Sequence, residues 1–123
     1  MSIQFSIFLE DNLLKVKASG KDDNLEDVLN YTNAIIDAAL QNNAHRILCD
    51  ERDLEYNLSI GETFQLAEIV AEKHKYAERI AIVHHPQFET DAQFYETVAT
   101  NRGLIVKVTS NIEFALKWLK EDT

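Results

Sequence analysis

Residues 3–18 read IQFSIFLEDNLLKVKA, and their alternation decides how the fold begins. Apolar side chains fall on every second position within 3–9 and again within 14–18. A period of two residues is typical of a strand that buries one face. A short polar turn at 10–12 separates the two runs, so the stretch predicts an antiparallel β-hairpin.

After the hairpin the apolar positions step by three and four, which is the period of a helix that buries one face. Short apolar runs bounded by polar residues interrupt that period and predict buried strands. The pattern predicts helices over 25–40, 60–74, 91–102 and 111–119, and strands over 46–50, 79–84 and 104–108. Three consecutive strand–helix–strand units require parallel strands. The order ββαβαβαβα therefore predicts an α/β fold with a mixed, mostly parallel sheet, covering helices and an antiparallel N-terminal edge.

Signals at the helix ends support these boundaries. Three stretches have the pattern of a capping box, in which the first side chain accepts a free backbone N–H and the fourth reaches back: Ser59–Glu62, Thr90–Gln93 and Ser110–Glu113. Asn24 is expected to cap the first helix, and Gly103 to end the third in the left-handed conformation.

The composition predicts one domain spanning residues 1–123, because no linker, repeat or low-complexity tract interrupts the pattern. A formal net charge of −9 argues against a nucleic-acid partner. Cys49 is the single cysteine, which excludes an internal disulfide. No apolar run approaches the roughly 18 residues that cross a bilayer. The opening residues lack the basic start of a signal peptide, so we expect a reducing, cytoplasmic setting.

Ser59 carries two interpretations. As an N-cap, its hydroxyl satisfies a free N–H and contributes roughly 1 kcal/mol. As a phosphoacceptor, it would place about −2 charge at the positive end of a helix and on a surface that a partner can contact. The capping role already explains the presence of a serine here and is favoured, whereas the phosphoacceptor role is the hypothesis that would give Ser59 a regulatory function.

The histidines give no metal-binding pattern. His84 and His85 end a predicted strand, where neighbouring side chains point to opposite faces, so the two imidazoles cannot easily share one ion. His45 and His74 are isolated in the sequence and are expected to be solvated or to lie at helix ends. We therefore expect no metal site.

Two constellations invite an enzymatic interpretation. Cys49 ends a strand next to Asp50, but no histidine partner is evident, so a small core residue is expected. The acids Asp22 and Asp23, with Asp50 and Lys107, invite comparison with a two-component receiver domain. That comparison fails on layout, because these acids follow a hairpin and Lys107 lies inside its strand.

The acidic run Asp50–Glu55 is expected to be a solvated loop, since it lacks the D-x-D-x-D-G spacing of a calcium loop. The chain also lacks a G-x-S-x-G nucleophile elbow and a glycine-rich phosphate loop. A hydrolase or phosphotransfer enzyme is thus the weakest hypothesis. We expect no catalytic residues and no cofactor.

Aromatic side chains cluster near two predicted loops. Tyr56 and Leu58 precede the second helix, while Phe88, Phe94 and Tyr95 lie at and just after the start of the third. If the two loops face each other, these residues form an aromatic mouth able to take an acyl chain. The alternative, which we favour, is that they complete the core.

The chain resembles STAS domains, the anti-anti-sigma-factor fold, and above all their SpoIIAA-like branch, also called STAS/SEC14-like and found in uncharacterised bacterial proteins. The resembling pieces are RILCD at 46–50, ETVATNRGL at 96–104 and IEFALKWL at 112–119. The likeness covers nearly the whole chain. It implies a non-enzymatic regulatory module that acts through protein–protein interaction.

The resemblance also implies where such a module would be switched. In anti-anti-sigma factors a serine at the start of the second helix is phosphorylated by a partner kinase, and the phosphate breaks the complex. Ser59 occupies a comparable place, although the family's Asp-Ser-Ser/Thr-Gly run is absent. The alternative function is a carrier or sensor of a small lipophilic ligand, with at most transient membrane contact. An edge strand with unpaired backbone groups makes a homodimer a further expectation.

Overall fold

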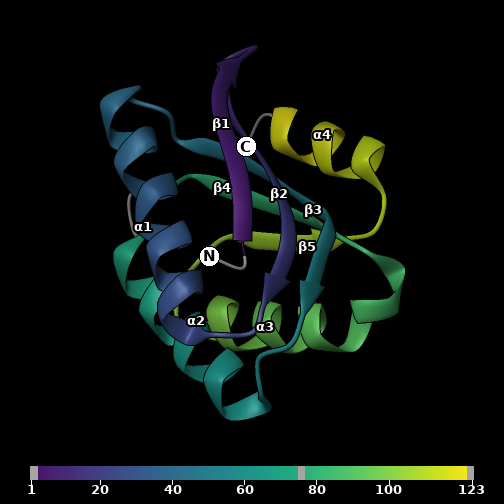
Figure 1. Ribbon diagram of the computed structural model, residues 1–123. Helices are drawn as coiled ribbons and strands as arrows, with labels where there is room; N and C mark the ends of the chain where they lie inside the picture. The colour runs from purple at the N-terminus through teal and green to yellow at the C-terminus, as the bar shows by residue number, and fades with distance from the viewer. Residues whose placement is uncertain (1–2, 75–76, 122–123) are drawn as a thin grey trace.

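The computed structural model describes residues 3–74 and 77–121, and over these it is an α/β sandwich. The strands are β1 (Ile3–Glu10), β2 (Leu13–Asp22), β3 (Arg46–Tyr56), β4 (Arg79–His84) and β5 (Val106–Thr109). The helices are α1 (Leu25–Gln41), α2 (Ile60–Lys73), α3 (Glu89–Asn101) and α4 (Ile112–Lys120), with a 3-10 turn, η1 (Pro86–Phe88), before α3. Figure 1 shows their arrangement.

The five strands lie in sequence order, β1-β2-β3-β4-β5. β1 pairs antiparallel with β2, and the remaining pairs are parallel. The predicted hairpin and the mostly parallel sheet with an antiparallel edge are therefore confirmed.

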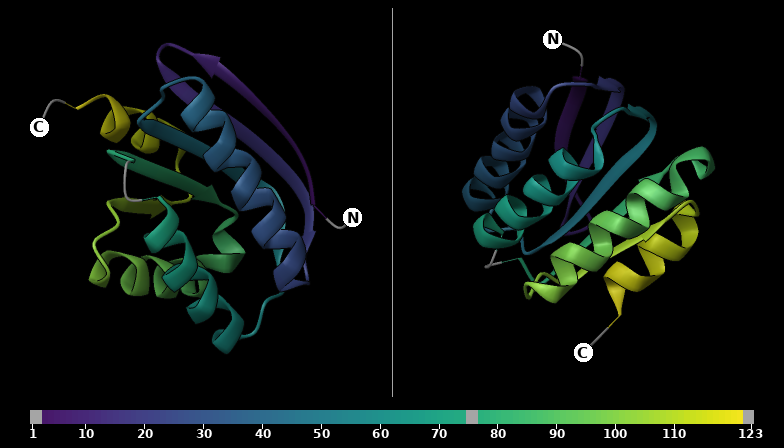
Figure 2. Two further views of the ribbon diagram at one scale, coloured as in Figure 1. Left: turned by 90° about the vertical axis from the view of Figure 1, so that its left-hand side faces the viewer. Right: turned by 90° about the horizontal axis from the view of Figure 1, so that it is seen from below.

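Helices cover both faces of this sheet. Side chains of α1, α2 and α3 pack with alternate strand residues such as Val16 and Ile47 in the larger core. The intervening positions, such as Leu48 and Val83, pack against α4 in a smaller core. Figures 1 and 2 show α4 across the sheet from the other helices. The period of two in the strands thus separates two cores.

β3 is longer than predicted, and this corrects the expectation of a solvated loop at Asp50–Glu55. The strand runs on to Tyr56 and pairs with β2 along that length. The register shifts between Lys17 and Ser19, so that two residues of β3 lie opposite one residue of β2. Such a bulge shifts the alternation by one position. Before it, Cys49 and Glu51 face α1 and α2; after it, Leu54 does.

The helix caps agree with the sequence in part. The box at Ser59 is present, with the Glu62 N–H donating to Ser59 Oγ at 3.1 Å and the Ser59 N–H donating to Glu62 Oε1 at 3.0 Å. Asn24 caps α1 through the Asp27 N–H, and Gly103 has a φ of +96° after α3. α4 is capped by Asn111, one residue later than expected.

The box predicted at Thr90–Gln93 is absent. η1 leads directly into α3, which begins at Glu89 and has no side-chain cap. The His85 ring caps η1 by accepting the Gln87 N–H at 3.0 Å. The Gln93 amide donates to Glu89 at 2.9 Å along the helix surface. Pro86 at the first position of the turn starts helical geometry earlier than the sequence pattern suggested.

Two side chains in or next to α2 differ in burial from what their positions suggest. His74 lies at the C-cap of α2, which agrees with the predicted helix-end position, but it is buried there and not solvated. Phe64 precedes Ala67 by three residues, a spacing that predicts a position on the buried face, but it is 40% exposed. The buried stripe is formed by Leu66, Ala67, Val70 and Ala71.

Candidate functional site

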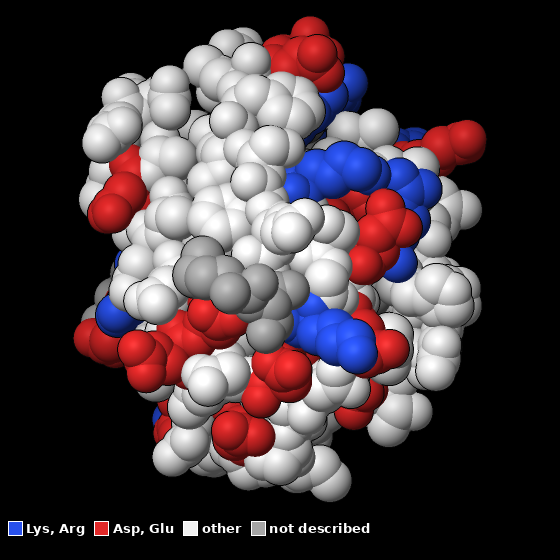
Figure 3. Space-filling model, in the orientation of Figure 1, with Lys and Arg blue, Asp and Glu red and all other residues white. Residues whose placement is uncertain are grey.

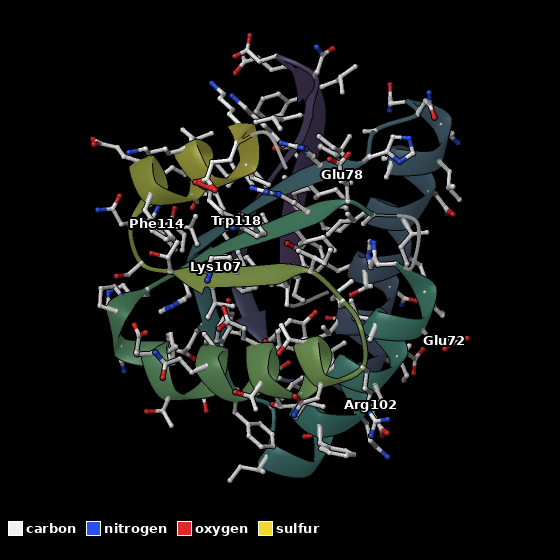
Figure 4. The ribbon with its side chains drawn as sticks, turned by 180° about the vertical axis from the view of Figure 1, so that it is seen from behind. Glu72, Glu78, Arg102, Lys107, Phe114 and Trp118 are labelled. Carbon is white, nitrogen blue, oxygen red and sulfur yellow. The ribbon has the colours of Figure 1, made fainter. Side chains whose placement is uncertain are left out.

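The N-terminus of α2 presents Ser59 at the surface, followed by two exposed apolar side chains. Ser59 itself is exposed. Ile60 is 73% exposed and Phe64, one turn further, is 40% exposed. The guanidinium of Arg102, at the end of α3, lies 5.6 Å from the Phe64 ring centroid and 2.5 Å from a carboxylate oxygen of Glu68. Figure 4 shows Arg102 at that end of α3, beside α2.

The loops before α2 and α3 face each other, as the aromatic-mouth hypothesis requires. The rings of Tyr56 and Phe88 lie 5.4 Å apart between centroids. Tyr56, Leu58 and Tyr95 line a cavity below this contact. Phe94 packs against the core. Tyr56, Leu58 and Tyr95 also pack against this core, as the favoured alternative expects. Of these residues and Phe94, only Phe94 does not line the cavity.

The cavity lies between the sheet and helices α1, α2 and α3, and its volume is about 100 Å³. Most of its wall is apolar, including Val28 and Ile35 from α1 and Leu66 and Val70 from α2. Its polar groups include Asp22, Tyr31, Glu51, Tyr56 and Asp91. Asp22, Glu51 and Tyr56 come from the carboxyl-terminal parts of β2 and β3, where open α/β sheets place ligands.

Glu51 is the centre of the polar part. It is 8% exposed and accepts hydrogen bonds from Tyr31 Oη at 2.8 Å and Tyr56 Oη at 2.5 Å. Burial raises the pKa of Glu51, while the tyrosine hydrogen bonds and nearby His84 oppose that rise. Burial and the Glu51 charge raise the pKa of both tyrosines well above the usual value, so both remain donors. The cavity therefore carries a carboxyl group held in place by two hydroxyls.

Asp22 is a second buried acid on the cavity wall. It is 7% exposed, and its Oδ1 accepts the Asn57 N–H at 2.6 Å. Burial raises its pKa to about 7, against the lowering effect of that hydrogen bond, and the charges of Glu51 and Asp91 contribute to the rise. Asp22 therefore exchanges its proton near neutral pH.

His84 lies next to Glu51 in register across β3 and β4 and is fully buried. Its Nδ1 lies 2.9 Å from the His85 carbonyl oxygen, and its Nε2 lies 3.7 Å from Glu89 Oε2. His85 is exposed and its ring caps η1, so the two imidazole rings do not point to a common site. Among residues 3–74 and 77–121, no group of three or more His, Cys, Asp or Glu side chains is arranged to hold a metal ion.

The two enzymatic constellations are not assembled. Cys49 is a buried free thiol, and burial raises its pKa, which makes it unreactive as a nucleophile. Lys107 is in register with Ala81, whose side chain belongs to the core beside α4, whereas Asp22 faces the opposite core. Figure 4 shows Lys107 on β5, on the side of α4. The receiver-like residues thus lie on different faces of the sheet.

Sequence reasoning did not find Glu51, Tyr31 and Asp22 as cavity residues. Glu51 lay inside a charged run that was interpreted as a loop, although it continues the alternation of Ile47 and Cys49 and therefore faces the cavity. A signal was available, because Leu54 and Tyr56 continue an alternation beyond Asp50. Extending the strand as far as Tyr56 would have placed Glu51 on the same face as Ile47 and Cys49, which belong to the core.

Comparison with known proteins identifies the fold. No protein-family model and no curated protein matches the sequence. The structure is similar to that of an anti-sigma factor antagonist from Mycobacterium paratuberculosis, with a TM-score of 0.69 and 15% identity over 98% of this chain and 96% of that one. It is also similar to an uncharacterised DUF3478 protein with a SpoIIAA-like fold from Shewanella loihica PV-4, with a TM-score of 0.59 and 20% identity over 96% and 94% of the two chains.

These likenesses agree with the element order, the sheet topology and the antiparallel edge described above. Among the described residues, no helix is both long and apolar enough to cross a membrane. The sequence-based expectation about the architecture is therefore confirmed, and the chain has the SpoIIAA-like fold of STAS domains.

Proposed function

We propose that this protein is a regulatory binding module that acts by contacting a protein partner and catalyses no reaction. Its fold matches an anti-sigma factor antagonist over almost the full length of both chains. Such a module would act in the cytoplasm, as expected from the sequence. The proposed contact surface is the N-terminal half of α2, centred on Ser59, Ile60 and Phe64.

The observation that carries this proposal is the exposure of Ile60 and Phe64 beside a capped helix start. Large apolar side chains that are exposed together, next to polar groups, are typical of interaction sites. Arg102 lies over the Phe64 ring and adds a cation to the same surface. Aromatic side chains and arginines are the residues that most often dominate binding energy in interfaces.

Ser59 offers a way to control that surface. Its Oγ accepts the Glu62 N–H, and the Glu62 carboxylate accepts the Ser59 N–H. A phosphate on Oγ would bring about −2 charge next to the Glu62 carboxylate, although the helix N-terminus favours an anion. We propose that phosphorylation of Ser59 weakens partner binding by placing this charge next to the apolar surface that Ile60 and Phe64 expose.

Affinity capture from lysate of the native host, with quantitative mass spectrometry, tests this proposal. Ile60→Asp is compared with Ile105→Asp, since Ile105 is also an exposed isoleucine but lies outside α2. A specific partner should be lost with Ile60→Asp and with Ser59→Asp, and retained with Ile105→Asp. Equal capture by all three variants would show that α2 does not form the contact.

The cavity supports a second candidate, the binding of a small ligand with an apolar body and one polar group. Its volume of about 100 Å³ is smaller than the roughly 150 Å³ engineered cavity that accepts benzene. As it stands it therefore fits only a ligand smaller than a six-membered ring, and a ring or a long acyl chain would require α2 and α3 to separate. Native mass spectrometry of protein purified without detergent tests this candidate. A reproducible adduct that Val70→Phe removes would support it, and an unliganded mass in repeated preparations would contradict it.

A further inference from the structure

The outer edge of β1 is open and carries almost no charge. β1 is the first strand in the sheet order, and among the described residues no strand pairs with its outer side. Its eight residues contain no lysine, arginine or proline, and Glu10 is the only charged one. Its pairing with β2 runs from Ile3 to Glu10 without a register shift. Edge strands usually carry lysines, prolines or bulges that prevent pairing with another chain, and β1 has none of these.

Both faces of β1 expose apolar side chains along this edge. Phe8 is 47% exposed and Leu9 is 50% exposed. Phe5, on the face of α1, meets the Tyr31 ring edge-on at 5.1 Å and is also partly exposed. Figure 3 shows an uncharged band along β1, with acidic residues at its upper end and basic residues to its right. The edge therefore offers unpaired backbone groups inside an apolar surface.

The charge of the protein favours this edge as a contact between two copies. A net charge of −9 makes two copies repel each other over most approaches. Along β1 two chains can meet without placing like charges opposite each other, provided that Glu10 lies beyond the paired residues. A two-fold antiparallel pairing centred on Ser6 achieves this, since Ile3 then lies opposite Leu9 and the ladder ends before Glu10.

The same pairing matches the alternation of β1 with itself. Phe5 lies opposite Ile7 of the second copy, so that the apolar positions of both strands share one face. Gln4 lies opposite Phe8 on the other face. Cross-strand pairs of aromatic and branched side chains stabilise such a ladder. We propose that two copies of this protein pair antiparallel through β1, about a two-fold axis at Ser6, and join their sheets into one continuous sheet.

A charge placed at the axis tests this proposal. Ser6 is exposed, so Ser6→Lys should fold normally, which circular dichroism verifies. In the dimer, residue 6 meets its own copy, and two lysines would lie directly opposite each other. We expect sedimentation equilibrium to show a concentration-dependent dimer for the unmodified protein and a dimer dissociation constant up to about fivefold larger for Ser6→Lys. Ser110→Lys makes the same change at an exposed serine outside β1, and it should dimerise like the unmodified protein.

The direction of the effect separates specific pairing from general electrostatics. Ser6→Lys reduces the net negative charge, so general repulsion between copies would weaken and association would increase. Ser6→Glu should also dissociate, and a mixture of Ser6→Lys with Ser6→Glu should recover the dimer, because lysine then faces glutamate. A monomer at all concentrations of the unmodified protein, or a Ser6→Lys dimer of unchanged strength, would overturn the proposal.

Discussion

Replacing Asp22 by asparagine should make the protein more stable at alkaline pH. Asp22 is 7% exposed, and its pKa is raised to about 7 because burial and the nearby charges of Glu51 and Asp91 disfavour the carboxylate. Its Oδ1 accepts the Asn57 N–H at 2.6 Å. An asparagine has a similar shape and keeps an acceptor for this hydrogen bond, but it carries no charge to bury.

The sign of the effect follows from proton binding. The ordinary pKa of 3.8 applies in the unfolded chain, so between 3.8 and about 7 the folded state binds more protons than the unfolded state. The contribution of Asp22 to the free energy of unfolding is therefore present in acid and is lost as the pH rises towards 7. At roughly 1.4 kcal/mol per pKa unit, the loss between pH 5 and pH 8 is at most about 3 kcal/mol. Solvent at the mouth of the cavity screens part of it, so we expect roughly 1–3 kcal/mol.

Urea unfolding of both proteins at pH 5 and pH 8 measures this difference. The stability of Asp22→Asn minus that of the unmodified protein should grow by the stated amount between the two pH values. Groups that do not interact with Asp22 titrate equally in both proteins and cancel in the comparison, whereas the coupling of Asp22 to Glu51 and Asp91 is part of the measured effect. Asp23→Asn, a change at the neighbouring exposed acid, should show no such growth. The reasoning would be refuted if the difference in unfolding free energy between the two proteins did not change with pH, or if Asp22→Asn were the less stable protein at pH 8.

Three further predictions concern other buried or strained positions. Burial lowers the pKa of His74 from 6.5 to about 4, so on acidification the unfolded state binds the His74 proton first and the folded state loses stability between these pH values. In urea unfolding, His74→Leu should reduce this loss of stability by up to roughly 3 kcal/mol. An unchanged dependence of stability on pH would contradict this prediction. Cys49 is buried, so its thiol should not react with iodoacetamide in native buffer but should react fully in urea, which mass spectrometry measures. Rapid alkylation of the native protein would show that the thiol is accessible and would contradict this prediction. Gly103→Ala should reduce the unfolding free energy by about 1 kcal/mol, because φ is +96° there, and an equally stable variant would mean that the backbone tolerates a side chain.

The architecture was predictable because each element has its own local signal. The hairpin alternates with a period of two, the helices repeat every three to four residues, and Pro86 and Gly103 mark element ends. Parallel strands then follow from the crossover units without further information. These signals are short-range, and the structure preserves them.

The cavity was only partly predictable, since it depends on long-range packing. Tyr56, Leu58 and Tyr95 were considered as mouth residues, behind the favoured interpretation as core residues, because they are aromatic or apolar and lie near loops. Glu51 was not, because a carboxylate in a charged run is expected to be solvated, and only the packing of α1 against β3 shows that it is buried against Tyr31. Burial of a charge is decided by elements far apart in the chain, which no local pattern records.

Photo-crosslinking in living host cells tests the proposed binding function most directly. Benzoylphenylalanine is placed at Phe64 or at Phe114, two exposed phenylalanines on opposite sides of the sheet. If the N-terminal half of α2 contacts a regulatory partner, irradiation yields a discrete protein adduct from position 64 that Ser59→Asp reduces, and none from position 114. A partner captured from position 114 alone, or an adduct at position 64 that Ser59→Asp leaves unchanged, would contradict the account.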